Sequence, residues 1–193
     1  MSASRNFLKA LGLVAALLGA QQAVAATAVF AGGCFWCMEQ AFQELDGVNT
    51  VVSGFTGGTL ENPTYKGDHT GHYEAIEVDY DPEAISYEDL LETYWHNIDP
   101  FDDRGQFCDK GFSYRAAIFA LDETQQELAA SSLSKVQDRF PSEDVVTQIL
   151  PGSTFWPVEE YHQDYYLKNP LRYRYYKGRC GRADRLEEIW GEK

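Results

Sequence analysis

Short apolar segments of strand length alternate along this chain with segments whose apolar residues recur at helical spacing. The pattern and its bounding turn residues predict strands at residues 28–31, 48–55, 73–80, 114–121 and 145–150. The order β-α-β-β-α-β-α-β-α predicts the α/β (α+β) class, because helices that alternate with strands pack on the faces of a sheet. We expect a single domain, built as a mixed β-sheet with packed helices in a two-layer sandwich of ferredoxin-like type.

Residues that begin helices support this pattern. Ser86, with an acidic residue three positions later, is typical of a capping box, and Asp122 is placed to cap a helix that reaches towards residue 140. Pro157 favours the first turn of a further helix that continues through Tyr166. The aromatic and basic residues that follow have no clear period, so no element is predicted there.

The first residues have the features of a secretory signal peptide. Arg5 and Lys9 precede an apolar run of about 11 residues, and the small residues at positions 23–25 suit a cleavage site. That run is shorter than the roughly 20 residues that span a bilayer, although an uncleaved anchor is the alternative. We therefore expect residues 1–25 to be removed as a signal peptide. Residues 26–193 are then expected to act free of the membrane, as a periplasmic or secreted domain.

The formal net charge of −14 excludes one class of partner. An acidic surface repels nucleic-acid phosphates, and only residues 172–185 concentrate basic side chains. We interpret that short region as a basic patch that offsets part of the acidic charge, and not as a nucleic-acid interface. The expected form is a monomer that binds no nucleic acid.

Four cysteines, Cys34, Cys37, Cys108 and Cys180, leave several possibilities open. In an exported chain an even number of cysteines usually forms structural disulfides, here in one of three pairings. Cys34 and Cys37 form a C-x-x-C pair, which is typical of thiol–disulfide exchange or of half a zinc site. A zinc site needs a second close pair of ligands, and Cys108 and Cys180 are each solitary, so no metal is expected.

Cys34 is the strongest candidate for a nucleophile. It follows Gly32 and Gly33 at the point where the first predicted strand turns into a helix. A thiol in the first turn of a helix meets unpaired backbone N–H groups and the positive end of the helix dipole, which favour the thiolate. Because the thiolate is the reactive form, this position predicts covalent chemistry.

Glu74 is the second candidate. If residues 73–80 form a strand, its period of two places Glu74 on the same face as Ile76 and Val78. Burial there would raise the pKa of the carboxyl group and make it a proton donor near neutral pH, whereas exposure at the strand end would leave an ordinary surface acid. The sequence alone leaves both interpretations open.

Other polar and aromatic residues carry less information one by one. A chain with 12 tyrosines buries several of them with satisfied hydroxyl groups. Tyr65, Tyr114 and Asp109 are therefore interpreted as structural from their spacing alone. Phe35 and Trp36 suit either the core or an aromatic wall beside a nucleophile.

Separated motifs then occur in a fixed order along the chain. They are GCFWCME at residues 33–39, NPTY at 62–65, TGHYE at 70–74, CDKG and YR between 108 and 115, and EEYHQDY at 159–165. Together they resemble the peptide methionine sulfoxide reductase A family, from about residue 28 to near residue 166. The resemblance implies an oxidoreductase that reduces the S epimer of methionine sulfoxide, free or in proteins, and so repairs oxidised proteins.

The resemblance also implies a role for each candidate residue. Cys34 is the nucleophile that is left as a sulfenic acid, with no need for a metal or an organic cofactor. Glu74 donates a proton and binds the sulfoxide oxygen together with Tyr65 and Tyr114. Phe35 and Trp36 contact the substrate methyl group. Asp109 organises the site, and His162 supports it.

A second thiol must convert the sulfenic acid into a disulfide, which an external thioredoxin-like or periplasmic dithiol reductant then opens. Cys180, in a Gly-Arg-Cys-Gly turn of the C-terminal tail, resembles the mobile resolving cysteine of many family members. Cys37 replaces a glycine often found at that position and is close enough in sequence to compete. Cys108 could also resolve or relay.

Two other functions stay open. A C-x-x-C thiol–disulfide oxidoreductase would use Cys34 and Cys37 on protein disulfides, with Glu74 incidental. An acidic binding module would hold its cysteines in two permanent disulfides and catalyse nothing. The number of free thiols and the need for Cys37 in a single turnover separate these possibilities.

Overall fold

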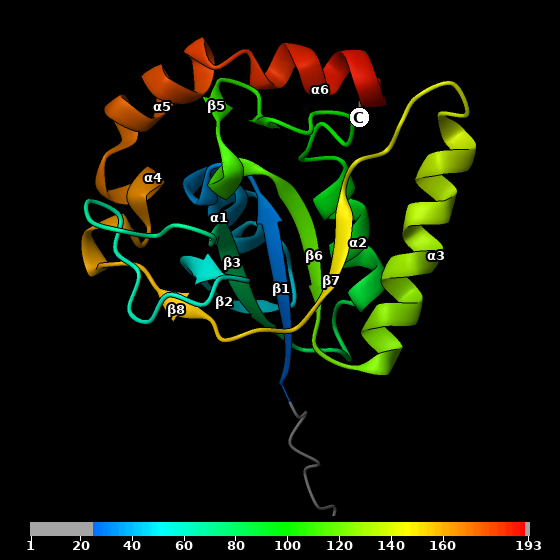
Figure 1. Cartoon of the computed structure of the whole chain (residues 1–193), viewed down its shortest axis with the longest axis horizontal. Helices are drawn as coiled ribbons and strands as arrows, with labels where there is room; N and C mark the ends of the chain where they lie inside the picture. Colours follow the sequence, from blue (N-terminus) through cyan, green and yellow to red (C-terminus); the bar gives the residue numbers. More distant parts are fainter. Residues whose placement is uncertain (1–24, 192–193) are drawn as a thin grey trace, which may run out of the picture.

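The computed structural model describes residues 25–191, so the expected signal peptide lies outside the described residues except for its last position. Figure 1 shows a central sheet with α3 along one side and α5 and α6 across one end. The elements in chain order are β1 (Ala26–Gly32), α1 (Phe35–Gln43), β2 (Val48–Thr56), β3 (Tyr73–Tyr80), α2 (Tyr87–Trp95), β4 (Gly105–Gln106), β5 (Asp109–Lys110), the 3-10 turn η1 (Phe112–Tyr114), β6 (Ala116–Ala120), α3 (Glu123–Arg139), β7 (Gln148–Pro151), β8 (Trp156–Pro157), the 3-10 turn η2 (Glu160–His162), α4 (Tyr165–Lys168), α5 (Pro170–Arg179) and α6 (Arg182–Trp190).

A six-stranded mixed sheet forms the centre of the domain, with the strand order β7-β6-β1-β3-β2-β8. Neighbouring strands run antiparallel, except β6 and β7, which are parallel. β4 and β5 pair separately as a short hairpin. The prediction of a single domain with helices packed on a mixed sheet is confirmed.

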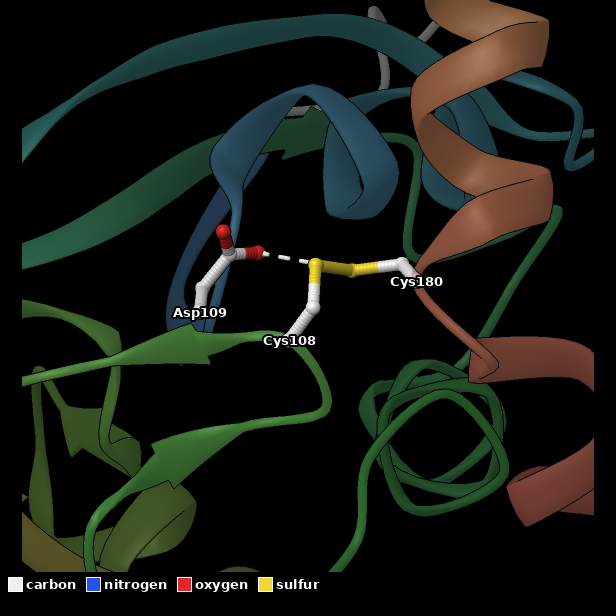
Figure 2. A group of neighbouring side chains, drawn as sticks. All are labelled: Cys108, Asp109 and Cys180. Carbon is white, nitrogen blue, oxygen red and sulfur yellow. Dashed lines mark hydrogen bonds between the residues drawn. A yellow bond between two sulfur atoms is a disulfide. The ribbon is translucent and has the colours of Figure 1, made fainter.

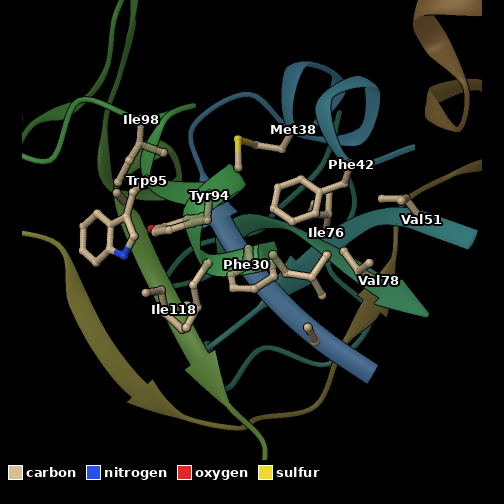
Figure 3. Close-up of a cluster of buried hydrophobic side chains, with 14 of the residues drawn as sticks. Phe30, Met38, Phe42, Val51, Ile76, Val78, Tyr94, Trp95, Ile98 and Ile118 are labelled. Atoms are coloured by element: carbon tan, nitrogen blue, oxygen red, sulfur yellow. The ribbon is translucent and has the colours of Figure 1, made fainter. Parts of the chain in front are cut away.

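The main hydrophobic core lies between this sheet and helices α1 and α2. Phe30 of β1 stacks on Phe42 of α1 and on Tyr94 of α2, with ring centroids 5.2 Å apart in each pair. Figure 3 shows these rings together with Ile76 of β3 and Met38 of α1. Burial of each large apolar side chain contributes roughly 1.5–3 kcal/mol, so the cluster holds the start of α1 firmly against the sheet.

Two helices begin where the sequence predicts. The Ser86 hydroxyl accepts the backbone N–H of Asp89, and the Asp89 carboxylate accepts the N–H of Ser86, which completes the capping box of α2. Asp122 accepts the N–H of Gln125 at 2.8 Å and begins α3. These side chains bond to N–H groups that the first helical turn leaves without a partner.

β3 has the predicted bounds, and β1 and β2 extend the predicted segments by one or two residues at an end, while β6 and β7 differ more. β6 is shorter than expected, because the residues before it form η1, which ends at Tyr114. β7 begins at Gln148 and not at residue 145. Its register is set by parallel pairing of Ile149 with Ile118 of β6, a contact that the local pattern does not specify.

The predicted helix from Pro157 through Tyr166 is wrong. Pro157 lies in the edge strand β8, where the lack of a proline N–H is tolerated. Helical turns follow as η2 and α4, and Asp164 separates them with left-handed backbone at φ 53°. Glu39 Oε1 accepts the N–H of Asp164 at 2.9 Å and holds this break. A long-range contact therefore overrides the local helical signal.

The C-terminal region, for which the sequence predicts no element, forms α5 and α6, orange and red in Figure 1. Tyr173 is the buried residue of α5, so its apolar periodicity is too weak to indicate a helix. α6 is anchored by Trp190, whose indole N–H donates to the carbonyl of Ile98 at 3.1 Å. Within the described part of the chain, no helix combines the length and the apolar character needed to cross a membrane.

Candidate active site

Cys34 lies between β1 and α1, at the N-cap position of the helix, as predicted from the sequence. Gly33 makes this turn possible. Its φ of 82° is left-handed, and a Cβ atom there would come within 2.5 Å of the Gln106 side chain, so only glycine fits. The N–H groups of Cys37 and Met38 donate to the Cys34 carbonyl at 3.1 and 3.3 Å, which fixes the first turn below the thiol.

The free thiols of Cys34 and Cys37 form a buried pair, with exposed fractions of 5% and 4%. Burial raises the pKa of Cys34 well above its ordinary value. The hydrogen bond with Cys34 lowers the pKa of Cys37 to about 6 against the effect of burial, and the positive charges of Arg182 and Lys177 contribute. The pKa values of the two thiols are therefore shifted in opposite directions, upward for Cys34 and downward for Cys37.

Two effects oppose each other at Cys34. The helix N-terminus favours a thiolate there, whereas burial raises the pKa of Cys34 and the positive charges of Arg182 and Lys177 act on Cys37. Transfer of the Cys34 proton to the adjacent Cys37 would leave Cys34 as the thiolate.

Glu74 lies on β3 with 1% of its surface exposed. Its Oε2 accepts the N–H of Phe35 at 3.2 Å, which places the carboxyl group at the start of α1. Burial raises the pKa of Glu74 to about 8, and the charge of Asp109 adds to the rise, while hydrogen bonds with Phe35 and Tyr114 oppose it. Of the two interpretations left open by the sequence, the structure has the buried carboxyl group, protonated at neutral pH.

Tyr65, Tyr114 and Asp109 act electrostatically on one another and on Glu74. Burial raises the pKa of Tyr65 to about 12, with the Glu74 charge as the next cause, and burial likewise raises the pKa of Tyr114 and of Asp109. Both phenols keep their protons at neutral pH and can donate hydrogen bonds to an oxygen atom beside Glu74. The structure thus brings together three residues that spacing alone does not distinguish.

Phe35 and Trp36, the first residues of α1, form an aromatic wall with Tyr65 and His162. The ring centroids of Phe35 and Tyr65 lie 6.0 Å apart, and those of Tyr65 and His162 lie 4.1 Å apart. The Trp36 indole N–H donates to His162 Nδ1 at 3.1 Å, so His162 holds the indole ring in place. A small apolar group would find a complementary surface here, next to the thiol.

Comparison with known proteins agrees with this geometry. Residues 26–193 match the family described as peptide methionine sulfoxide reductase. The chain belongs to this family. It is therefore an oxidoreductase, and its cysteines carry the redox chemistry.

Relatives and solved structures of peptide methionine sulfoxide reductases cover most of the chain. MsrA 2 of Caulobacter vibrioides is 48% identical over 187 residues, which are 95% of this chain and 94% of that protein. Methionine sulfoxide reductase A of Corynebacterium diphtheriae has a TM-score of 0.72 at 31% identity, over 79% of this chain and 78% of that one. Mxr1 of Saccharomyces cerevisiae in complex with Trx2 shares the fold, with a TM-score of 0.55 at 20% identity, over 75% and 87%.

The cysteine pairing of this methionine sulfoxide reductase differs from a framework of two structural disulfides. Cys108 and Cys180 form a disulfide with a Cα–Cα distance of 4.9 Å (Figure 2), while Cys34 and Cys37 are free. The interpretation as a binding module with all cysteines paired is therefore wrong. Asp109, Cys108 and Cys180 have ligand atoms within 4.8 Å of one another, but bonded sulfurs are not thiolate ligands for a metal.

Three tyrosines of the reductase that the sequence analysis did not single out cover Cys34. Tyr165 stacks on Trp36 with ring centroids 3.8 Å apart at 7°. Tyr173 clusters with both free cysteines, Tyr176 packs against this cluster, and the Tyr176 hydroxyl donates to Asp109 Oδ2. We call Tyr165, Tyr173 and Tyr176 the C-terminal cover. Spacing of three to four residues between Tyr173, Tyr176 and Cys180 is the signal that could have revealed this face.

Proposed function

We propose that this chain reduces the S epimer of methionine sulfoxide, free or in proteins, with Cys34 as the nucleophile. The observation that carries the proposal is the contact between Glu74 and the start of α1, which brings a protonated carboxyl group to the turn that bears the thiol. Tyr65 and Tyr114 supply two more protonated groups for the sulfoxide oxygen. Phe35 and Trp36 offer the apolar surface for the methyl group.

The reductive step requires one thiol and one buried acid. Cys34 passes its proton to Cys37 and attacks the sulfoxide sulfur, while Glu74 donates a proton to the oxygen. The oxygen ends on Cys34 as a sulfenic acid, and the thioether of methionine leaves, so thiol and sulfoxide are converted to sulfenic acid and thioether without an external electron.

We further propose Cys37 as the resolving cysteine. Its thiol attacks the Cys34 sulfenic sulfur, the S–S bond forms, and the hydroxyl group leaves as water. The proposal is supported by the burial of both free thiols in one pair and by the pKa of Cys37 near 6, which supplies a thiolate. Cys108 and Cys180, the other candidates, are bonded to each other in this structure, whereas Cys37 is already a free thiol beside Cys34.

A dithiol of thioredoxin type is the proposed reductant, because two electrons must reopen the disulfide and no cofactor is needed to supply them. Yeast Mxr1, which shares this fold, has been solved in complex with Trx2.

We also propose that the core of the domain is ferredoxin-like. The strand order β6-β1-β3-β2, with α1 and α2 as the connecting helices, supports this proposal.

The substrate proposal is tested with a peptide that carries a single methionine sulfoxide of known configuration. With a dithiol present, we expect the S epimer to be converted to methionine and the R epimer to be left. A sulfoxide held by its oxygen at Glu74 and by its methyl group at the aromatic wall is discriminated by configuration, and the family resemblance assigns the S epimer. Chromatography of the peptide measures both. Equal consumption of the two epimers would contradict the proposed arrangement of Glu74 and the aromatic wall.

Replacement of Cys37 by serine is expected to preserve one turnover, at a lower rate because serine does not take up the Cys34 proton as the Cys37 thiolate does. Repeated turnover should slow by about tenfold or more, because resolution needs a second thiol. Mass spectrometry should find one methionine formed per chain and one added oxygen on Cys34. Complete loss of the single turnover would favour the C-x-x-C oxidoreductase. Cys180→Ser is the matched control, and it should not trap the sulfenic acid.

For location, we propose export with removal of residues 1–25. The basic start, the short apolar run and the small residues at positions 23–25 support this, and the family match begins at residue 26. The expected mature chain begins close to Thr27 and appears in the periplasmic or extracellular fraction. Intact mass measurement of each cell fraction would decide, and a cytoplasmic chain that retains residue 1 would contradict the proposal.

A further inference from the structure

The Cys108–Cys180 disulfide lies where it can control access to Cys34. Cys108 directly precedes Asp109, and Cys180 is one helical turn after Tyr176, whose carbonyl accepts the Cys180 N–H at 3.1 Å. Tyr176 and Asp109 are themselves hydrogen-bonded. The disulfide therefore links the segment that carries Asp109 to the helix that carries Tyr176, close to Cys34. Figure 2 shows the bond beside the Asp109 carboxyl group.

With this bond in place, the substrate surface of Cys34 is occupied by the protein itself. Tyr176 packs against the side-chain cluster that contains Cys34, and Tyr165 lies flat on Trp36, the ring proposed to contact the substrate. Cys34 is left 5% exposed. A sulfoxide cannot reach the sulfur until the C-terminal cover moves.

α5 depends on few other contacts. Tyr173 is its buried residue, and the hydroxyl of Tyr173 and the Lys177 amine both donate to Gln40 Oε1, at 2.8 and 2.9 Å. Leu171 and Tyr175, on its outer side, are 75% and 67% exposed. Arg182, two residues after Cys180, is buried and donates to the Asn97 carbonyl, so the start of α6 stays fixed when the bond is broken. Without the disulfide, the hydrogen bonds and the Tyr173 ring would hold α5 itself over the site, so its opening would become easier.

The disulfide differs from the nucleophile in accessibility. Cys108 is exposed to solvent, whereas Cys34 and Cys37 are buried, so an external dithiol meets the Cys108–Cys180 bond first. We propose that this bond is a second redox site, a latch whose reduction releases α5 and uncovers Cys34.

Reduction of the latch takes two steps. One thiolate of the dithiol attacks the Cys108 sulfur, and Cys180 leaves as a thiol. The second thiol then frees Cys108, so two electrons pass to the latch and the reductant becomes a disulfide. The proposal rests on the proposed function of Cys34.

The test compares the full chain with its latch bond intact and the Cys108→Ser/Cys180→Ser double variant, both with Cys34 and Cys37 reduced. The rate of Cys34 alkylation by iodoacetamide, measured by peptide mapping, is expected to rise by about tenfold or more in the double variant. The first turnover of a sulfoxide peptide should accelerate in parallel. Leu171→Ala, on the exposed side of α5, is the matched control and should leave both rates unchanged.

Equal alkylation rates with and without the latch bond would overturn the proposal. Should the double variant fold poorly, amide hydrogen exchange of α5 in the natural chain, before and after reduction by a dithiol, gives the same decision, because a latch predicts faster exchange only after reduction. Alkylation reports exposure of Cys34 and not chemistry. Faster alkylation without sulfoxide reduction would therefore refute the proposed function alone, and unchanged alkylation with normal turnover would refute the latch alone.

Discussion

Replacement of Cys34 by serine is expected to lower the rate of methionine sulfoxide reduction by roughly 10⁴-fold or more, because a hydroxyl group cannot replace the sulfur as nucleophile or form the sulfenic acid. The measurement is a single turnover with excess enzyme and an S-sulfoxide peptide. Since both the first and the later turnovers need Cys34, the variant should fail in both when it is compared with the natural chain under the same conditions.

The fold of this variant serves as its own control. Cys34 occupies the N-cap of α1 without a side-chain cap bond, and serine is among the preferred residues at that position. The melting temperature should therefore be unchanged or slightly higher, so that lost activity cannot be assigned to unfolding. Retained reduction of the peptide by the serine variant would move the nucleophile to another thiol, with Cys37 the nearest.

Glu74→Gln is expected to slow the reductive step by about 10²-fold or more, because glutamine keeps the shape and the oxygen that accepts the Phe35 N–H but cannot donate the acidic proton. The effect should appear in the rate of the first turnover and much less in the peptide concentration that half-saturates the enzyme. Glu77→Gln is the matched control, since Glu77 lies on the same strand but on its other face, partly exposed.

The pH dependence gives an independent check on Glu74. Burial raises its pKa to about 8, so the carboxyl group carries its proton below that pH and loses it above. The rate of the reductive step should fall by about tenfold per pH unit above pH 8 in the natural chain, and this descending limb should vanish in Glu74→Gln. A limb that persists in the variant would assign the titration to another group.

The same raised pKa has a consequence for stability with a definite sign. The folded state binds the Glu74 proton more tightly than the unfolded chain, whose carboxyl group has a pKa near the ordinary value of 4.5. This contribution to the free energy of unfolding is complete below that value and is lost as the pH rises towards about 8. Glu74→Gln removes the loss, so the variant should resist alkaline unfolding better than the natural chain.

The sequence by itself determined the parts of the protein that depend on neighbouring residues. Cys34 at the start of a helix follows from two glycines between a strand pattern and a helix pattern. The period of two along β3 places Glu74 on the same face as Ile76 and Val78, although it left the burial of the carboxyl group open. The capping residues Ser86 and Asp122 also act over three positions. The order of the motifs was sufficient to indicate the family.

Only the tertiary structure decided how distant segments meet. The disulfide joins Cys108 to Cys180 across 72 residues, and no local pattern favours that pairing over the two others. The sequence predicts a helix from Pro157 through Tyr166, but the backbone breaks at Asp164. This break depends on a hydrogen bond to Glu39, which is distant in the chain. The C-terminal cover and the opposite pKa shifts of Cys34 and Cys37 depend likewise on which surfaces pack together. Periodicity reports which face of an element is apolar, but burial and electrostatic shifts depend on what covers that face.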